Sequence, residues 1–228
     1  MIGLPTLERV DDVLRGRSRA GSAPAPLRSQ TPGRLVACVV AFGTVYGGVM
    51  GTFGGVAGER VWQVVDSAIK VPLLLLATLA LGLPSFFVLN TLLGVRADFG
   101  KALGALLASQ AASTIVLAAL APFTALWYAS TSDYTAAVLF NAAMFGVSAV
   151  AAQGPLRRGY RPLIAGNRVH LRLLRVWLVL YAFIGIQMGW LLRPFVGDPL
   201  MPVRFFRGGA WENAYVLVGK MIWGKIAG

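Results

Sequence analysis

The chain has 228 residues and a net charge of +12, yet only 13% of its residues are charged and 57% are hydrophobic. This composition excludes a soluble globule, because a soluble domain averages about 25% charged residues, and the long apolar runs are typical of membrane proteins. Since the positive charges border those runs, we attribute them to membrane topology and anionic lipid headgroups, and we predict no nucleic-acid role.

Residues 1–33 are predicted to form a cytoplasmic segment ahead of the first apolar run. Residues 4–15 place apolar side chains on one face of a short helix, which would need a membrane surface or a protein partner to be stable. The following stretch is a flexible basic linker rich in Ser, Pro, Ala and Gly. No cleavable signal peptide is visible, so the first span should act as an uncleaved anchor.

Five apolar runs follow, at about residues 35–56, 71–93, 102–127, 136–152 and 173–192. Each is near the roughly 20 residues that cross a hydrocarbon core of about 30 Å. The sequence therefore predicts an all-α, polytopic transmembrane bundle of about five spans over residues 34–193.

Residues 194–228 are predicted to form an external tail. Pro194, Pro199 and Pro202 prevent a continuous helix up to about residue 203. From Ala210 onward the spacing of aromatic and apolar residues predicts an amphipathic helix, and its charged residues favour an interfacial position over a sixth span.

Arginines and lysines are distributed unevenly between the connections. Six arginines lie at or before Arg34, and six more lie from Arg157 to Arg175, around the connection between the fourth and fifth runs. The connections on the other side hold only Arg60 and Lys70. The positive-inside rule therefore predicts a cytoplasmic N-terminus and an external C-terminus. The high Ala, Gly and Arg content is typical of a GC-rich bacterium and predicts the cytoplasmic (inner) membrane.

Glycines recur every fourth residue in the first run, and the fifth run carries a shorter version of this pattern. The residues concerned are Gly43, Gly47, Gly51, Gly55, Gly185 and Gly189. Such a row forms a groove without side chains, which lets another helix backbone approach closely. The groove can pack against a neighbouring span, or it can form the seam of a homo-oligomer or a contact with a partner subunit.

Few polar side chains lie within the runs, and in lipid each needs a partner. Those singled out here are Thr44, Asn90, Ser109, Gln110, Ser113, Asn141 and Gln187. They are interpreted as interhelical hydrogen-bonding groups or as the lining of a solute pathway. No acidic or basic residue lies deep in any predicted run, which argues against a proton-driven transporter but not against a passive pore. Trp177 and Trp190 bracket the fifth run as predicted interfacial residues.

Enzyme signatures are missing from the sequence. The single histidine, His170, is interpreted as a solvated or headgroup-facing loop residue, and one histidine cannot supply the usual ligand set of a haem or zinc site. The single cysteine, Cys38, excludes an intrachain disulfide. We predict no enzymatic activity, no metal and no cofactor; an intramembrane enzyme or electron carrier is the weakest alternative.

Two basic segments are candidate contact surfaces. The predicted cytoplasmic loop over residues 154–172 suits anionic lipid or an acidic soluble partner. The Pro/Phe/Arg-rich stretch over residues 190–216 can cap the bundle or contact a partner. The candidate contact residues are Arg157, Arg158, Arg161, Arg168, Arg172, Arg193, Arg204 and Arg207.

The order of these features resembles the Yip1-type membrane proteins. The shared features are a cytoplasmic N-terminal segment, five closely packed spans rich in Gly, Ala and Leu, and a short external tail. The resemblance covers about residues 30–195 and concerns architecture only. It implies a non-enzymatic protein that organises membranes or escorts other membrane proteins, and it assigns no functional residue.

The leading hypothesis is a non-catalytic scaffold, anchor or accessory subunit of a larger membrane complex, in contact with other subunits or with itself. The alternative is a passive channel or small-solute transporter lined by Asn90, Gln110, Asn141 and Gln187.

Overall fold

The computed structural model describes residues 31–198 and 201–206. Five long helices make up this part of the chain, and it contains no strand. They are α2 (Pro32–Gly51), α3 (Val61–Leu92), α4 (Phe99–Ser130), α5 (Tyr134–Gly166) and α6 (Val169–Leu192). Short 3-10 helices, η2 (Gly58–Arg60) and η3 (Arg96–Asp98), precede α3 and α4.

All five helices are long and apolar enough to cross a membrane, which confirms the predicted all-α, multi-pass architecture. The predicted N-terminal amphipathic helix, the C-terminal interfacial helix and Arg207 lie outside the described residues.

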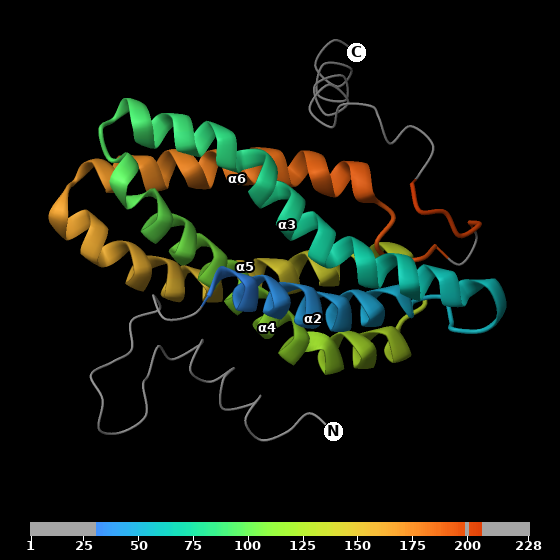
Figure 1. Cartoon of the computed structure of the whole chain (residues 1–228). Helices are drawn as coiled ribbons and strands as arrows, with labels where there is room; N and C mark the ends of the chain where they lie inside the picture. Colours follow the sequence, from blue (N-terminus) through green and yellow to red (C-terminus); the bar gives the residue numbers. More distant parts are fainter. Residues whose placement is uncertain (1–30, 199–200, 207–228) are drawn as a thin grey trace, which may run out of the picture.

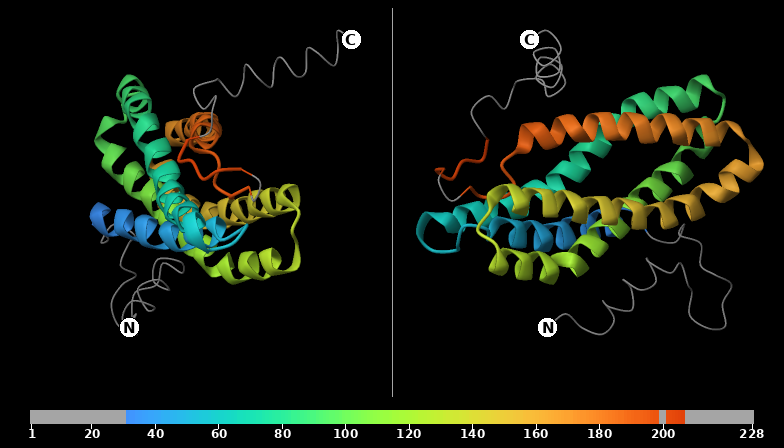
Figure 2. Two further views of the ribbon diagram at one scale, coloured as in Figure 1. Left: turned by 90° about the vertical axis from the view of Figure 1, so that its right-hand side faces the viewer. Right: turned by 180° about the vertical axis from the view of Figure 1, so that it is seen from behind.

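The helices alternate in direction, so their connections gather at two ends of the bundle (Figure 1). One end carries the α2–α3 and α4–α5 connections and the residues that follow α6; we call it the clamp end. The other carries the α3–α4 and α5–α6 connections, and we call it the arginine end. α2 packs between α3 and α4, α5 packs on α4, and α6 packs on α3, whereas α5 and α6 touch little (Figure 2).

Two helices extend well beyond the apolar runs that predicted them. α3 begins at Val61 instead of about residue 71, and α5 continues to Gly166 instead of ending near residue 152. The predicted loop over residues 154–172 is therefore wrong, because most of it is helix. Hydropathy marks where the chain turns polar, which is not where a helix has to end: α3 begins in a polar stretch, and α5 continues through Pro155 and Pro162.

The glycine row of α2 lies against the backbone of α3. A Cβ atom on Gly51 would lie 2.5 Å from Val64 Cα, and one on Gly43 would lie 3.3 Å from Pro72 Cβ. A Cβ on Gly47 would overlap the carbonyl oxygen of Ser67. α3 of the same chain thus fills the groove at these three positions.

The other glycines of the pattern are placed differently. Gly55 lies beyond the end of α2 with a φ of +108° and open space beside it. Gly189 also faces open space, whereas a Cβ on Gly185 would make ordinary contact with Thr78, at 3.6 Å from its Cγ2. The groove is therefore confined to the helical part of the row.

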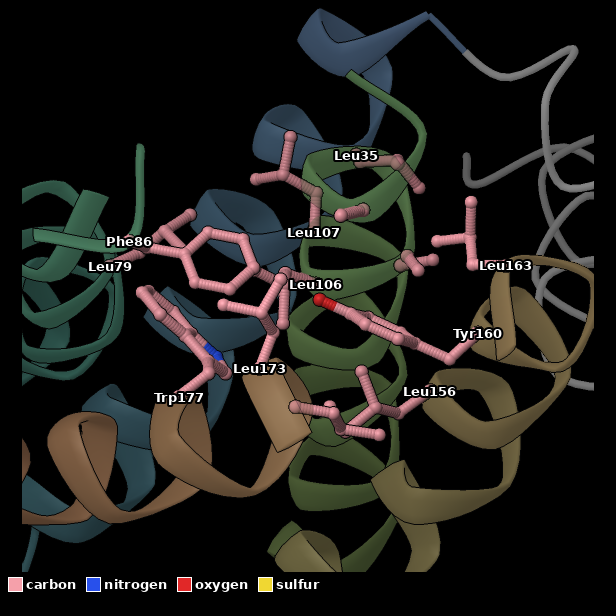
Figure 3. Packing of buried hydrophobic residues seen from close by; sticks show 14 of the residues in the cluster. Leu35, Leu79, Phe86, Leu106, Leu107, Leu156, Tyr160, Leu163, Leu173 and Trp177 are labelled. Carbon is pink, nitrogen blue, oxygen red and sulfur yellow. The ribbon is translucent and has the colours of Figure 1, made fainter. Parts of the chain in front are cut away.

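A compact apolar cluster fills the bundle toward the arginine end (Figure 3). Trp177 of α6 is 2% exposed and packs on Phe86 of α3, with ring centroids 4.8 Å apart. A Cβ on Gly82 would lie 3.0 Å from the indole ring, so this glycine provides the space that the ring occupies. The predicted interfacial position of Trp177 is wrong, because the neighbouring helix offers the ring a buried site.

Candidate functional site at the clamp end

Three polar side chains project from one face of the first half of α3. Gln63, Ser67 and Lys70 follow a spacing of four and three residues, which places them in a row along the helix. All three are at most 2% exposed. A buried polar group is costly without a hydrogen-bond partner, so the partners of this row identify what it holds.

The row binds the backbone of residues 193–198, which follow α6 in a non-helical conformation. Ser67 Oγ donates to the carbonyl oxygen of Phe195 at 2.5 Å, and Lys70 Nζ donates to that of Pro194 at 2.8 Å. Gln63 Nε2 donates to Ser67 Oγ at 3.0 Å and lies 3.4 Å from the same Phe195 oxygen. We call residues 193–198 the strap and the three α3 side chains the clamp.

Three further contacts hold the C-terminal part of the strap. Arg60, at the start of α3, donates to the carbonyl oxygen of Asp198 at 3.2 Å. Val196 is buried in the apolar cluster of the clamp end, and a Cβ on Gly197 would lie 2.8 Å from Gln63 Cγ. The strap therefore closes this end of the bundle by both polar and apolar contacts.

Lys70 is a fully buried cationic side chain in the first third of α3. Besides the Pro194 oxygen, its Nζ lies 4.7 Å from the ring centroid of Phe205, so it touches both the strap and the segment that returns from it. Asp66 stands one helical turn earlier. Hydropathy places Lys70 in the connection before the second apolar run, but it lies within α3, because the helix begins nine residues before it.

A second polar group lies in the same half of the bundle, between α2, α4 and α5. Tyr46 donates its hydroxyl to Asn141 Oδ1 at 3.0 Å, and Asn141 Nδ2 donates to the Tyr128 hydroxyl and to the Ala137 carbonyl. These bonds use both ends of the Asn141 amide, and Phe53 packs on the Tyr128 ring at 5.0 Å. Asn141 thus acts as an interhelical hydrogen-bonding group.

The other amides of the proposed pathway bond elsewhere. Gln110 donates to the Leu75 carbonyl and to the Tyr181 hydroxyl, while Asn90 donates back to the Phe86 carbonyl of its own helix. Among the described residues, no hydrogen bond joins any two of the four amides, including Gln187. Gln110 thus joins α4 to α3 and α6, whereas the hydrogen bond of Asn90 stays within α3.

His170, at the arginine end, is buried rather than solvated. It is 1% exposed, and its Nε2 lies 3.4 Å from Asp98 Oδ2. Asp98 also pairs with Lys101. The predicted exposed position of His170 is wrong, because α6 begins at Val169 and the ring turns inward against the α3–α4 connection.

The basic residues named as contact candidates fall at both ends. Arg157, Arg158 and Arg161 lie exposed on α5, and Arg168 and Arg172 lie exposed at the start of α6. Arg193 stacks on the Trp190 ring at 3.2 Å, and Arg204 is exposed beyond the strap. Within the described part of the chain, no group of three or more His, Cys, Asp or Glu side chains could hold a metal ion.

Sequence reasoning did not identify the clamp. Its signal was present as Gln63, Ser67 and Lys70, a polar row at helical spacing just before an apolar run. The apolar run by itself predicts a helix that begins near residue 71, and this leaves the row in the preceding connection.

No family model matches the chain, and no curated protein or solved structure matches it either. The resemblance to the Yip1-type proteins stays a prediction.

Proposed function

We propose that the protein is a non-catalytic membrane anchor or accessory subunit that meets another membrane protein at its clamp end. The observation that carries this proposal is the clamp itself. Three buried side chains of α3 hold a non-helical segment in one position across the end of the bundle. Because α3 side chains hydrogen-bond to the backbone of the strap, the strap is held in place and the residues that follow it start from a fixed position.

The presented residues have the composition of a protein contact. Met201 is 58% exposed and Phe206 is 45% exposed, and the exposed Arg204 lies between them in the chain. Aromatic residues, Met and Arg are enriched at protein interfaces, where a few of them supply most of the binding energy. Binding of a partner to a pre-ordered segment also avoids the entropic cost of ordering it.

The geometry supports this role over a passive channel. The α2 groove is filled by α3, and two of the four amides, Gln110 and Asn141, bond to side chains or backbone of neighbouring helices. We expect no solute flux through liposomes that contain the purified protein. A solute-specific flux above that of empty liposomes would favour the channel instead.

The test of the proposed contact is co-purification from native membranes in mild detergent. The wild-type protein should purify as one defined assembly, and Met201→Ser combined with Phe206→Ser should release the partner. Val56→Ser is the matched control, because Val56 is 59% exposed in the α2–α3 connection at the same end. A wild-type monomer without partners, or a double variant that keeps its partner, would contradict the proposal.

We further propose that the arginine end faces the cytoplasm, in an inner membrane, as the positive-inside rule predicts. Orientation is measured with a membrane-impermeant thiol reagent on a Cys38→Ser background. Ser132→Cys places a thiol in the α4–α5 connection and should react from outside, whereas Ala165→Cys at the end of α5 should react only after lysis. The reverse pattern would invert the orientation.

A further inference from the structure

Five arginines at the arginine end lie on helix faces that turn away from the rest of the bundle. They are Arg157, Arg161, Arg168, Arg172 and Arg175, and all are exposed. None of them forms an ion pair or hydrogen bond within the part of the chain that the structure describes. Arg158 differs, because its guanidinium folds back to within 3.7 Å of the position of a Cβ on Gly154.

On α5, the arginines continue an apolar stripe. Leu139, Val150, Arg157 and Arg161 are separated by eleven, seven and four residues, which returns each to the same face of a helix. Leu139 is 65% exposed and Val150 is 74% exposed, opposite the face that packs on α4. Exposed aliphatic side chains on a membrane helix face lipid chains, so the arginines lie where that lipid-facing surface ends.

α6 repeats this arrangement from its other end. Arg168, Arg172 and Arg175 recur at intervals of four and three residues, and the same face continues to Val179 and Ile186. Val179 is 71% exposed and Ile186 is 58% exposed. α5 and α6 therefore each carry an exposed apolar face that leads into a row of arginines. These two consecutive helices meet at the short turn between Gly166 and Val169 (Figure 1).

The depth of these cations matches lipid headgroups. At 1.5 Å per residue, Arg157 stands about 10 Å along the axis from Val150, and Arg175 about 6 Å from Val179. These positions follow the exposed apolar faces along each helix, where a bilayer around the bundle would pass from acyl chains to headgroups. A soluble partner would approach the bundle end-on, whereas phosphates of the adjoining lipids lie beside these groups.

We infer that the arginine rows of α5 and α6 form a binding surface for the headgroup phosphates of anionic phospholipids. Guanidinium binds phosphate oxygens through paired, charge-assisted hydrogen bonds, and two rows on adjacent helices can hold several headgroups around the turn. This inference does not depend on the proposed partner at the clamp end.

The test compares two spin-labelled lipids at the protein surface by electron paramagnetic resonance. The protein is reconstituted in phosphatidylcholine vesicles with spin-labelled phosphatidylglycerol or spin-labelled phosphatidylcholine, and the relative association constants are measured. We expect a preference for phosphatidylglycerol that falls at least about threefold when Arg157, Arg161, Arg168 and Arg172 are changed to Gln. The same four positions changed to Lys form the matched control, which keeps the charge and should retain most of the preference.

The wild-type protein supplies an independent check that does not rely on the folding of a variant. Its preference for phosphatidylglycerol should decline when ionic strength is raised to about 1 M, where the Debye length is about 3 Å. Equal association of both lipids with the wild type would overturn the inference and leave an acidic soluble protein as the partner of this surface. A folded Gln variant with an undiminished preference would overturn it as well.

Discussion

Replacing Gly47 with alanine tests how closely α2 packs on α3. The added Cβ would overlap the carbonyl oxygen of Ser67 and lie 2.9 Å from the Cα of Ala68. Both neighbours are backbone atoms, so no side chain can rotate away to make room. The two helices would have to separate along the line on which they pack most tightly.

The loss of stability expected for Gly47→Ala follows from the geometry of this contact. A separation of at least about half an ångström is needed to restore ordinary van der Waals distance at Ala68, and dispersion contacts are lost along both helices. Overpacking of this kind costs about 1–3 kcal/mol in well-packed cores, and more where the backbone must move. We therefore expect the Gly47→Ala variant to be less stable than the wild type by about 2 kcal/mol or more.

Gly48→Ala is the matched control, because Gly48 is the next residue of the same helix and has no neighbour within 4 Å of its Cβ position. Alanine favours the helix by up to about 1 kcal/mol over glycine, so this variant should be neutral or slightly stabilising. The wild type and the two variants are purified in the same detergent, and their thermal unfolding temperatures are compared. Equal unfolding temperatures for the Gly47 and Gly48 variants would refute the backbone-to-backbone packing.

Three further substitutions and one control examine the buried polar contacts. Lys70→Met keeps the length of the side chain but leaves the Pro194 oxygen without its donor, and should lower the free energy of unfolding by about 1–3 kcal/mol. Limited proteolysis should also cleave the strap of this variant faster than that of the wild type. Unchanged cleavage would contradict the clamp. Asn141→Leu removes the hydrogen bonds that join three helices and should cost roughly 0.6–1.7 kcal/mol in chemical unfolding, as interhelical bonds in membranes do; a stabilised variant would contradict this role. His170→Ala opens a cavity at a buried position and should destabilise by about 1–3 kcal/mol, whereas Lys101→Gln, at an exposed residue, should change stability by less than about 1 kcal/mol. Similar losses in these last two variants would contradict the buried position of the histidine.

The clamp explains why a lysine is tolerated inside this bundle. An ammonium group in a membrane interior is costly unless polar groups surround it, and such residues face the protein interior. Lys70 faces the strap, where a carbonyl oxygen and the Phe205 ring replace part of its hydration. The same lysine thereby ties the segment after α6 to the first half of α3.

The length and spacing of the apolar runs were enough to predict five membrane-crossing helices. A chain that enters lipid must satisfy its backbone hydrogen bonds internally, so each sufficiently long apolar run has to be helical. The row of Gly43, Gly47 and Gly51 was likewise visible in the sequence as a surface for close helix packing. The sequence did not show which helix fills that groove, because a groove without side chains can pack against the backbone of any helix.

Only the tertiary structure decided where the charged and aromatic residues lie. Lys70, His170 and Trp177 all stand near the borders of apolar runs, where hydropathy assigns them to loops or interfaces. In the folded chain all three are buried, because each contacts a specific neighbour. Lys70 contacts the strap, His170 contacts Asp98, and Trp177 packs beside Gly82. These neighbours are far away in the sequence, so their effect exists only once the helices have packed.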